Sequence, residues 1–365
     1  MKIMFYINSI EFGGAERVIA NLADYFASIG NESVLVTSYY SSQEYSLAPG
    51  VRRLAMEERE TEQPRISKNV SRIGKLRRIC KTEKPDILIS FMKEPNFRAV
   101  LATRFLSVKT VVSVRNDPNV EYAGVEGKIV GKILLPLSDG CVFQTEDARR
   151  WFPKRMQKKS RIICNAVKEE FYRVRRKPVR GEIITCGRLF EQKNDALLID
   201  AFAGVAEKIP YATLKIYGEG PLKDELQKKI DNLGLRDKVT LMGNTDNVAE
   251  ALKRADLFVL SSDFEGMPNA LMEAMAAGVP SISTDCPCGG PRELFGKELS
   301  SLLVPVKDTE SLREKMLSYL ESTDEEKKAL SSVFRTAAEK FSPDRVYGEW
   351  ADYVSSVVER QRPFV

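Results

Sequence analysis

Residues 256–294 read DLFVLSSDFEGMPNALMEAMAAGVPSISTDCPCGGPREL, and this stretch decides the fold. The apolar run 257–260 is typical of a buried parallel strand, and a polar loop connects it to a helix predicted over 269–277. Gly278 stands where a left-handed residue ends a helix, and a second apolar strand follows over 280–284. Strand, helix and strand in this order predict the βαβ unit of a doubly wound α/β sheet.

Two glutamates lie at the start of this helix. Glu265 precedes it, and Glu273 falls in its first turns. The free N–H groups and the positive dipole end of a helix N-terminus attract an anion. A carboxylate nearby can accept two hydrogen bonds from a vicinal diol such as a ribose. One strand-to-helix junction can therefore hold phosphate, ribose and sugar together; the alternative is that both glutamates are solvated surface charges.

The composition is that of a globular protein with about two domains, because 43% of its 365 residues are hydrophobic and 29% are charged. The chain has no apolar run long enough to predict a membrane-spanning helix, and MKIMFYINSI at the N-terminus lacks a signal-peptide cleavage pattern. Six scattered cysteines suit a reducing cytosol, so we expect a cytoplasmic protein. Cys286 and Cys288 lack a second pair at ligand spacing, and no metal site is expected.

The chain contains no histidine, which excludes Ser-His and Cys-His catalysis and a histidine-ligated metal. Charge is distributed unevenly: residues 1–180 hold 33 basic and 20 acidic side chains, whereas residues 181–365 hold 23 and 31. A basic first half suggests an anionic partner for that half. No nucleic-acid recognition motif accompanies the charge, so nucleic acid is not the partner we expect.

A glycine pair follows the first predicted strand, residues 3–7. Gly13 and Gly14 stand between this strand and a helical periodicity that begins at Val18, where a ligand can approach the backbone closely. The dinucleotide pattern Gly-x-Gly-x-x-Gly is missing, which argues against a dehydrogenase. The alternative is a tight turn that binds nothing.

Two basic segments suggest contact with an anionic membrane surface. Residues 66–84 predict an amphipathic helix with an apolar stripe, Ile66, Val70, Ile73, Leu76 and Cys80, and basic side chains around it. Residues 149–155 interleave basic and apolar side chains. The alternative for both segments is a solvated basic surface.

A charged, aperiodic segment over 168–181 marks the domain boundary. Beyond it, a strand over 182–186 leads into the loop GRLFEQKN. Arg188 and Lys193 lie in this loop, where both can point into the crevice at the strand ends and hold a diphosphate without metal. Two unrelated surface charges are the alternative.

FEGMPNALMEAMAAGVPSISTD, with GRLFEQKN, GGAER and IICNAV elsewhere, resembles the retaining, nucleotide-sugar-dependent glycosyltransferases of family four, also called group 1. The resemblance implies the GT-B fold, in which two Rossmann-like doubly wound domains face a central cleft. Residues 1–172 would bind the acceptor, residues 180–343 would bind the nucleotide sugar, and a terminal helix over 344–365 would cross back to the first domain.

The resemblance also assigns roles to residues. The catalytic set is Arg188, Lys193, Glu265 and, as an assisting group, Asp117. The donor set is Glu273, Gly266, Met267, Pro268, Asn269, Gly187, Gly218, Leu241 and Asn247. The acceptor set is Gly13, Gly14, Arg17, Arg115 and Asn116. Many relatives carry a histidine near Arg115 and Asn116, and this departure puts an acceptor contact carried over from that histidine in doubt.

The predicted reaction moves a hexose or N-acetylhexosamine from a nucleotide-diphosphate sugar, UDP being our first choice and GDP-mannose remaining open. The acceptor is a glycan or a polyprenyl-diphosphate-linked sugar in bacterial surface polysaccharide or glycan assembly. The resemblance implies retention without metal or cofactor, with the leaving phosphate oxygen taking the acceptor's proton. We expect peripheral contact with the inner face of the cell membrane. Alternatives are a UDP-sugar 2-epimerase, which the missing histidine disfavours, and a non-catalytic sugar-nucleotide-binding protein.

Overall fold

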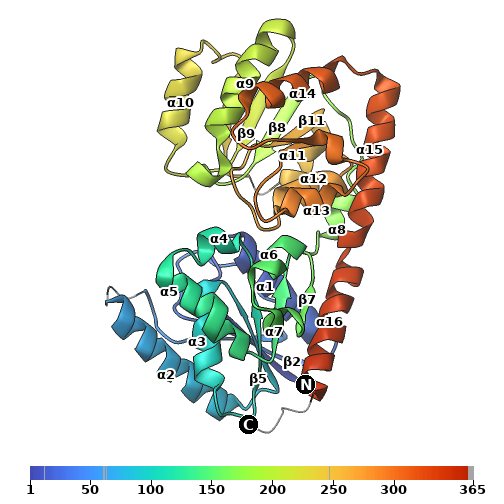
Figure 1. The fold of residues 1–365 in the computed structure, drawn as a ribbon. Helices are drawn as coiled ribbons and strands as arrows, with labels where there is room; N and C mark the ends of the chain where they lie inside the picture. The colour runs from blue at the N-terminus through green and yellow to red at the C-terminus, as the bar shows by residue number, and fades with distance from the viewer. Residues whose placement is uncertain (12, 61, 63, 246, 361–365) are drawn as a thin grey trace. The chain divides into compact units, whose positions relative to one another are not determined.

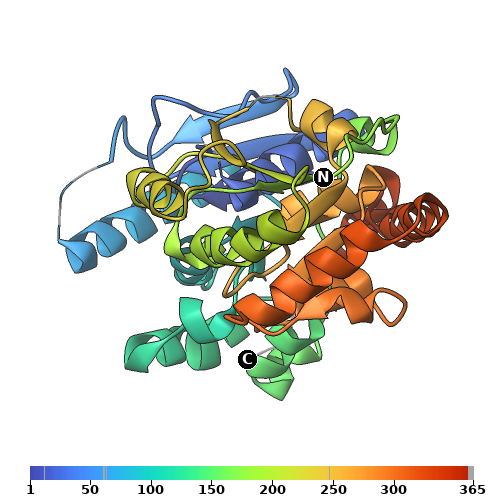
Figure 2. The ribbon, with the colours of Figure 1, turned by 90° about the horizontal axis from the view of Figure 1, so that it is seen from above.

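The computed structural model describes residues 1–360 except 12, 61, 63 and 246, so residues 361–365 of the predicted terminal helix lie outside the described residues. The chain forms two compact units: unit 1 comprises residues 1–165 and 344–365, and unit 2 comprises residues 166–343. Each unit contains a parallel sheet covered by helices (Figure 1, Figure 2).

Unit 1 contains a seven-stranded parallel sheet in the order β3-β2-β1-β4-β5-β6-β7. Its strands are β1 (Lys2–Ile7), β2 (Glu32–Thr37), β3 (Val51–Ala55), β4 (Ile87–Phe91), β5 (Lys109–Ser113), β6 (Gly140–Phe143) and β7 (Ser160–Ile162). The central strands β1 and β4 are almost wholly apolar and buried, as a sheet covered on both faces requires.

The helices of unit 1 cover this sheet. They are α1 (Gly14–Ser28), α2 (Arg65–Glu83), α3 (Lys93–Thr103), α4 (Pro118–Glu121), α5 (Gly124–Ile129), α6 (Glu146–Trp151), α7 (Lys154–Gln157) and α16 (Pro343–Glu359). A π-helical segment, η1 (Val130–Leu134), and a 3₁₀ turn, η2 (Leu135–Leu137), continue α5.

The last helix, α16, packs on unit 1 through buried aromatic residues. Trp350 stacks on Phe91 with ring centroids 6.0 Å apart. The Tyr353 hydroxyl accepts from the Cys141 N–H at 2.8 Å and donates to the Lys159 carbonyl at 2.5 Å. These contacts explain why the end of the chain belongs to the unit that contains its beginning.

Unit 2 contains a six-stranded parallel sheet in the order β10-β9-β8-β11-β12-β13. Its strands are β8 (Glu182–Cys186), β9 (Thr213–Tyr217), β10 (Val239–Gly243), β11 (Leu257–Leu260), β12 (Ser281–Thr284) and β13 (Leu303–Val304). Its helices are α8 (Glu169–Tyr172), α9 (Asp195–Lys208), α10 (Lys223–Asn232), α11 (Val248–Arg254), α12 (Asn269–Ala276), α13 (Gly290–Phe295), α14 (Thr309–Glu321) and α15 (Asp324–Ala338). The strand order reverses between β8 and β11, which is where such sheets bind ligands.

The division between the units differs from the predicted boundary. The first domain was expected to end at residue 172, whereas the contacts divide the chain between Asn165 and Ala166. The reason is α8, which packs against α12 of unit 2.

Candidate active site

Two loops of unit 2 meet at the carboxyl ends of β8 and β11, which are neighbours in the sheet. Residues 187–194 follow β8, and residues 261–268 follow β11. The Asp263 N–H donates to the Gln192 carbonyl at 2.9 Å, and the Gln192 amide donates to the Phe264 carbonyl at 2.9 Å. The Asn194 amide donates to the Asp263 carboxylate at 2.8 Å. These hydrogen bonds hold the two loops together at the carboxyl ends of the strands.

Lys193 and Glu265 form an ion pair across the two loops. The Lys193 ammonium lies 2.5 Å from Glu265 Oε1, and the Glu265 side chain is only 9% exposed. The Ser262 hydroxyl donates to the same carboxylate oxygen at 2.9 Å. A cation and an anion therefore lie side by side at the switch point, where the strand order of unit 2 reverses between β8 and β11. Their roles in donor binding stay predictions.

Ser262 is a member of the site that the sequence analysis missed. Its carbonyl accepts from the Thr284 hydroxyl at 2.6 Å and from the Cys286 thiol at 3.1 Å, and both come from the end of β12. Thr284 thereby fixes the backbone from which Ser262 reaches Glu265. The only sequence signal for these two supporting residues was their position, because Ser262 lies just before the motif over 264–285 and Thr284 lies near its end.

Glu273 lies in the second turn of α12 and is buried, as are Gly266, Met267 and Pro268 before that helix. Burial, with the nearby Glu273 carboxylate as a further cause, raises the pKa of the Cys186 thiol at the end of β8. The charge of Glu273 is therefore felt at the end of β8, the strand that leads into the loop over 187–194. Asn269, the first residue of α12, is half-buried.

Close backbone approaches shape the rest of the site. Gly218 has φ +140°, and a Cβ there would lie 1.8 Å from the Gly187 carbonyl oxygen. A Cβ on Gly290 would lie 1.9 Å from the Gly266 carbonyl oxygen. Arg188 is exposed, with its guanidinium 5.1 Å from the ring centroid of Phe190.

Two predicted donor residues serve structural contacts. Leu241 is half-buried on β10 and packs against the hydrophobic core of unit 2. The Asn247 side chain accepts from the Glu250 N–H at 3.0 Å and so caps α11. The side chains that meet at the switch point come from the loops after β8 and β11. The donor contacts of Leu241 and Asn247 stay predictions.

In unit 1, Gly13 caps α1, and Gly14 and Arg17 lie in the first turn of that helix. Arg115 is buried: its guanidinium lies 3.8 Å from the Phe91 ring centroid and donates to Asn165 at 2.8 Å. Burial lowers its pKa. Arg115 therefore packs the interior of unit 1 and presents little surface to an acceptor.

Asn116 and Asp117 form a turn at the start of α4. Asn116 accepts from the Asp117 N–H at 2.9 Å, and the Asp117 carboxylate accepts from the Asn119 N–H at 2.9 Å and the Asn119 amide at 3.1 Å. Asp117 is thus an N-cap, and its predicted assisting role has to compete with these bonds.

Glu121, at the end of α4, is a titratable group that the sequence analysis did not select. Burial raises the pKa of its carboxyl to about 7, and its Oε1 accepts from the Lys93 N–H at 2.8 Å. Its other oxygen is buried without a hydrogen-bond partner in the described part of the chain. Sequence offered no signal, because Glu121 is one acidic residue in a polar turn.

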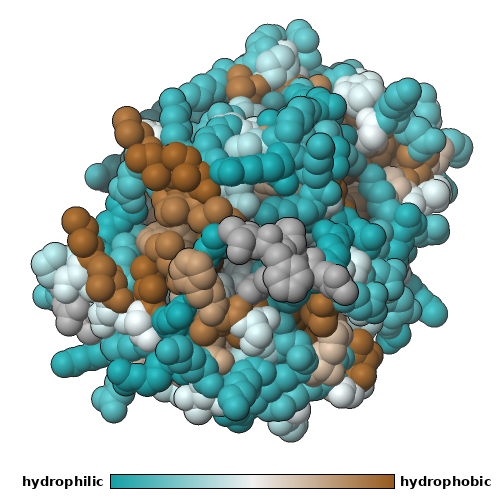
Figure 3. Space-filling model, turned by 60° about the horizontal axis from the view of Figure 1, so that its bottom comes forward, coloured by the Kyte–Doolittle hydropathy of each residue, from teal (hydrophilic) through white to brown (hydrophobic). Residues whose placement is uncertain are grey.

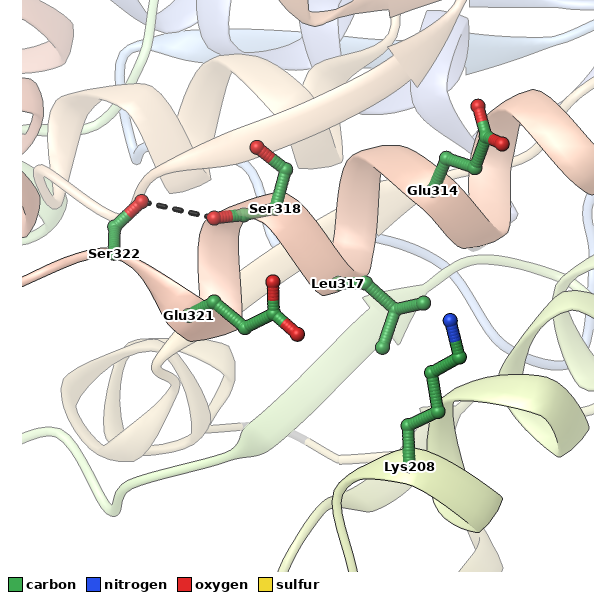
Figure 4. Close-up of a pocket in the computed structure, with 6 residues that line it drawn as sticks. All are labelled: Lys208, Glu314, Leu317, Ser318, Glu321 and Ser322. Atoms are coloured by element: carbon green, nitrogen blue, oxygen red, sulfur yellow. Dashed lines mark hydrogen bonds between the residues drawn. The ribbon is translucent and has the colours of Figure 1, made fainter.

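A separate hollow of about 380 Å³ lies between the end of α9 and α14. Figure 4 shows Lys208 on one side and Glu314, Leu317 and Glu321 on the other, with Ser322 bonded to Ser318. Lys208 ends the helix that begins beside Lys193, so this hollow is about 20 Å from the ion pair. It belongs to the outer surface and not to the candidate site.

Comparison with known proteins places the chain in a family. The model of the group 1 glycosyl transferases matches residues 168–336, and that of glycosyltransferase family 4 matches residues 12–171. The chain is a family 4 glycosyltransferase. As a family 4 enzyme with two Rossmann-like sheets, it has the GT-B fold.

Two similar relatives are themselves glycosyltransferases. The chain is 28% identical over 372 residues to the N-acetylgalactosamine-N,N'-diacetylbacillosaminyl-diphospho-undecaprenol 4-alpha-N-acetylgalactosaminyltransferase of Campylobacter jejuni, covering 97% of this chain and 99% of that protein. It is 32% identical over 258 residues to an uncharacterized glycosyltransferase of Methanocaldococcus jannaschii, covering 64% of this chain and 63% of the relative.

Solved structures with the same fold include HepE of Anabaena in complex with UDP and glucose. The TM-score is 0.79 at 17% identity, covering 98% of this chain and all of that one. In the described part of the family 4 chain, no group of three acidic or cysteine side chains is placed to hold a metal ion, and metal independence stays a prediction.

The basic helix α2 of this family 4 enzyme differs from its prediction. Arg72 is buried and pairs with Glu57 at 2.7 Å, and Arg77 donates to the carbonyls of Ala102 and Arg104 at 2.8 and 2.7 Å. These cations therefore hold unit 1 together, which leaves fewer of them for a membrane. The apolar stripe of this helix is divided, because Leu76 and Cys80 are buried whereas Ile66 and Val70 are exposed.

Side chains of the segment 149–155 also contact other residues of unit 1. Arg149 pairs with Glu146 at 2.7 Å, and Phe152 is buried between Tyr122 and Phe143. Phe152 therefore points inward and Trp151 is half-buried, whereas Arg150, Lys154 and Arg155 are exposed. Contact of this segment with a membrane stays a prediction.

Proposed function

We propose that this enzyme transfers a hexose or N-acetylhexosamine, with retention and without metal, from a UDP-sugar to a glycan or polyprenyl-diphosphate-linked acceptor. The observation that carries the proposal is the Lys193–Glu265 pair, 2.5 Å apart at the switch point of unit 2, with buried Glu273 on the adjoining helix. The family membership restricts the reaction to glycosyl transfer.

The donor would lie over the loops after β8 and β11. Arg188 and Lys193 would hold the diphosphate, helped by the free N–H groups at the start of α12. Glu273 would accept hydrogen bonds from the ribose hydroxyls, and Glu265 would accept from the sugar. The loop bonds around Gln192 support this arrangement, because they fix the residues before any ligand arrives.

In the transfer, the bond between the anomeric carbon and the diphosphate oxygen breaks, and the acceptor oxygen bonds to the same face of that carbon. The acceptor's proton passes to the departing phosphate oxygen, so no protein base is required. Arg188 and Lys193 would stabilise the charge that develops on the diphosphate. We give Asp117 no step, because its carboxylate already accepts two hydrogen bonds from Asn119.

The acceptor assignment rests on relatives. Two Campylobacter jejuni proteins that align with 97% and 98% of this chain are N-acetylgalactosaminyltransferases that act on undecaprenol-linked sugars. Gly13, Gly14 and Arg17 at the start of α1 would meet the acceptor. We place the enzyme in the cytoplasm at the inner face of the membrane; no helix in the described residues has the length and apolarity to span a bilayer.

The experiment is a thermal-shift panel of UDP-, GDP- and ADP-sugars and NAD, each with and without EDTA. Because a ligand that binds only the native state raises the melting temperature, one UDP-sugar should shift it, and EDTA should leave that shift unchanged. Transfer is then followed with that sugar and an undecaprenol-diphosphate-linked acceptor. A shift with NAD alone, or an epimerised sugar released without acceptor, would contradict the proposal.

A further inference from the structure

A stripe of apolar side chains on unit 1 faces solvent instead of the core. The helical segment α5–η1–η2 carries Val125, Ile129, Ile133 and Leu137, each four residues after the last. Val125 is 77% exposed and Ile133 is 54% exposed, and the other two are exposed as well. Large apolar residues gathered on one exposed face are typical of an interaction surface.

The fold forces this stripe outward. A Cβ on Gly127 would lie 2.4 Å from the Tyr122 backbone, and one on Gly131 would lie 2.6 Å from the Trp151 ring. The glycine side of the segment is therefore pressed against unit 1. The segment is π-helical over η1, and such turns are frequent at functional sites.

Neighbouring helices extend the apolar surface. Phe105, just beyond α3, is 88% exposed, and Leu101 is exposed on the same helix. α3 contacts η1 and η2 as well as α2, whose Ile66 and Val70 are exposed. Figure 3 shows apolar residues gathered on the left of the face that turns forward, the side on which Figure 1 draws α2, α3 and α5.

Cations surround this apolar surface. Lys128 and Lys132 lie between the residues of the stripe, Arg104 stands beside Phe105, and Arg155 donates to the Lys132 carbonyl at 3.3 Å. Within the described residues, no carboxylate pairs with Lys128, Lys132 or Arg104. The one acidic side chain of the segment, Glu126, is neutralised by Arg65 at 3.0 Å.

We propose that Val125, Ile129, Ile133 and Leu137, with Phe105, form a surface that docks on a membrane containing anionic lipid. An apolar stripe inserts among the headgroups while the flanking cations meet their phosphates. A second copy of the chain is the weaker fit, because a two-fold contact would bring the same lysines together. The docking surface would bring the enzyme to the membrane that carries the proposed lipid-linked acceptor. Only this purpose of the surface rests on the proposed function.

The test is flotation with vesicles of phosphatidylcholine, alone or with about 30% phosphatidylglycerol. The wild-type protein should float with the anionic vesicles, and Ile129→Gln/Ile133→Gln should lower its partition coefficient at least about tenfold. Lys128→Gln/Lys132→Gln should lower it roughly thirtyfold, since each basic residue contributes about a fivefold gain near an anionic surface. The matched control, Val179→Gln/Leu233→Gln, changes two exposed apolar residues of unit 2 and should float like the wild type.

Three outcomes would overturn the proposal. The first is that both face variants, Ile129→Gln/Ile133→Gln and Lys128→Gln/Lys132→Gln, float like the wild type. The second is that Arg78→Gln/Lys81→Gln on α2 alone abolishes binding. The third is that the wild-type protein is a dimer in the absence of lipid and Ile129→Gln/Ile133→Gln converts it to a monomer. Transfer to a short water-soluble acceptor should be unchanged in the face variants. If no protein form transfers sugar but flotation responds as expected, the proposed function fails and the docking surface stands.

Discussion

The Lys193 ammonium and the Glu265 carboxylate lie 2.5 Å apart, although 72 residues separate them in the chain. The pair joins the two loops at the point where the strand order of unit 2 reverses. Donor binding would have to rearrange it, because the diphosphate and the sugar compete for the same two side chains. In the proposed function, the pair would keep this cation and this anion neutralised until the donor binds.

A double-mutant cycle separates the structural role of this pair from its role in binding. Lys193→Met leaves a buried carboxylate unpaired and should lower the free energy of unfolding by about 2–3 kcal/mol. Lys193→Met/Glu265→Gln should recover most of that loss in urea denaturation, since neither charge remains. Neither protein should transfer sugar. If the double variant is active, the pair is structural and the donor lies elsewhere.

Arg188 should matter for turnover and not for folding, because it is exposed. Arg188→Ala should lower kcat/KM roughly 10²–10³-fold by removing charge stabilisation from the leaving diphosphate. Its melting temperature should stay within about 2 °C of the wild type. Arg180→Ala is the control, because Arg180 is exposed on the same unit and packs over Tyr211. Equal activity of the two variants would remove Arg188 from the site.

Glu273 is expected to accept hydrogen bonds from the ribose hydroxyls of the nucleotide. The wild-type protein should bind UDP more tightly than 2′-deoxy-UDP, because one hydroxyl donor to the carboxylate is missing from the second ligand. In Glu273→Ala, isothermal titration calorimetry should give weaker binding and nearly equal Kd values for the two nucleotides. A preference that persists in the variant would assign the ribose contact to another group.

Gly218 should tolerate no side chain. Its φ of +140° and the 1.8 Å approach of a Cβ to the Gly187 carbonyl oxygen mean that Gly218→Ala has to move the loop over 187–194. We expect a loss of roughly 2 kcal/mol or more in unfolding free energy, and weaker UDP binding. Gly348→Ala is the control: nothing lies within 4 Å of a Cβ there, and α16 should gain about 0.5–1 kcal/mol.

Local features of the fold and of the site were predictable from the sequence, whereas features that depend on contacts between distant segments were not. The strand-loop-helix units around Arg188 and Glu265 follow from apolar runs, glycines and caps, so the sequence predicted the doubly wound sheets. The Lys193–Glu265 contact joins two of these units, and only the sheet order brings it about. The resemblance placed Arg115 among the acceptor residues, but in the structure it is buried against Trp350 from the far end of the chain. Likewise, the exposed stripe over 125–137 could not be told from a core stripe, because periodicity does not say which side faces water.

Glu121 gives the fold a pH dependence with a defined sign. Its ordinary pKa of 4.5 is raised to about 7 in the folded protein by burial. The folded state therefore holds a proton that the unfolded state releases between those pH values, so this contribution to stability is present at pH 4.5 and is lost as the pH rises through 7. Glu121→Gln cannot titrate. Its free energy of unfolding, relative to the wild type, should rise by about 1–3 kcal/mol between pH 5 and pH 8 in urea denaturation. Glu126→Gln changes an exposed acid on the next helix and should show no such rise. A parallel response in both variants would mean that burial does not raise the pKa of Glu121.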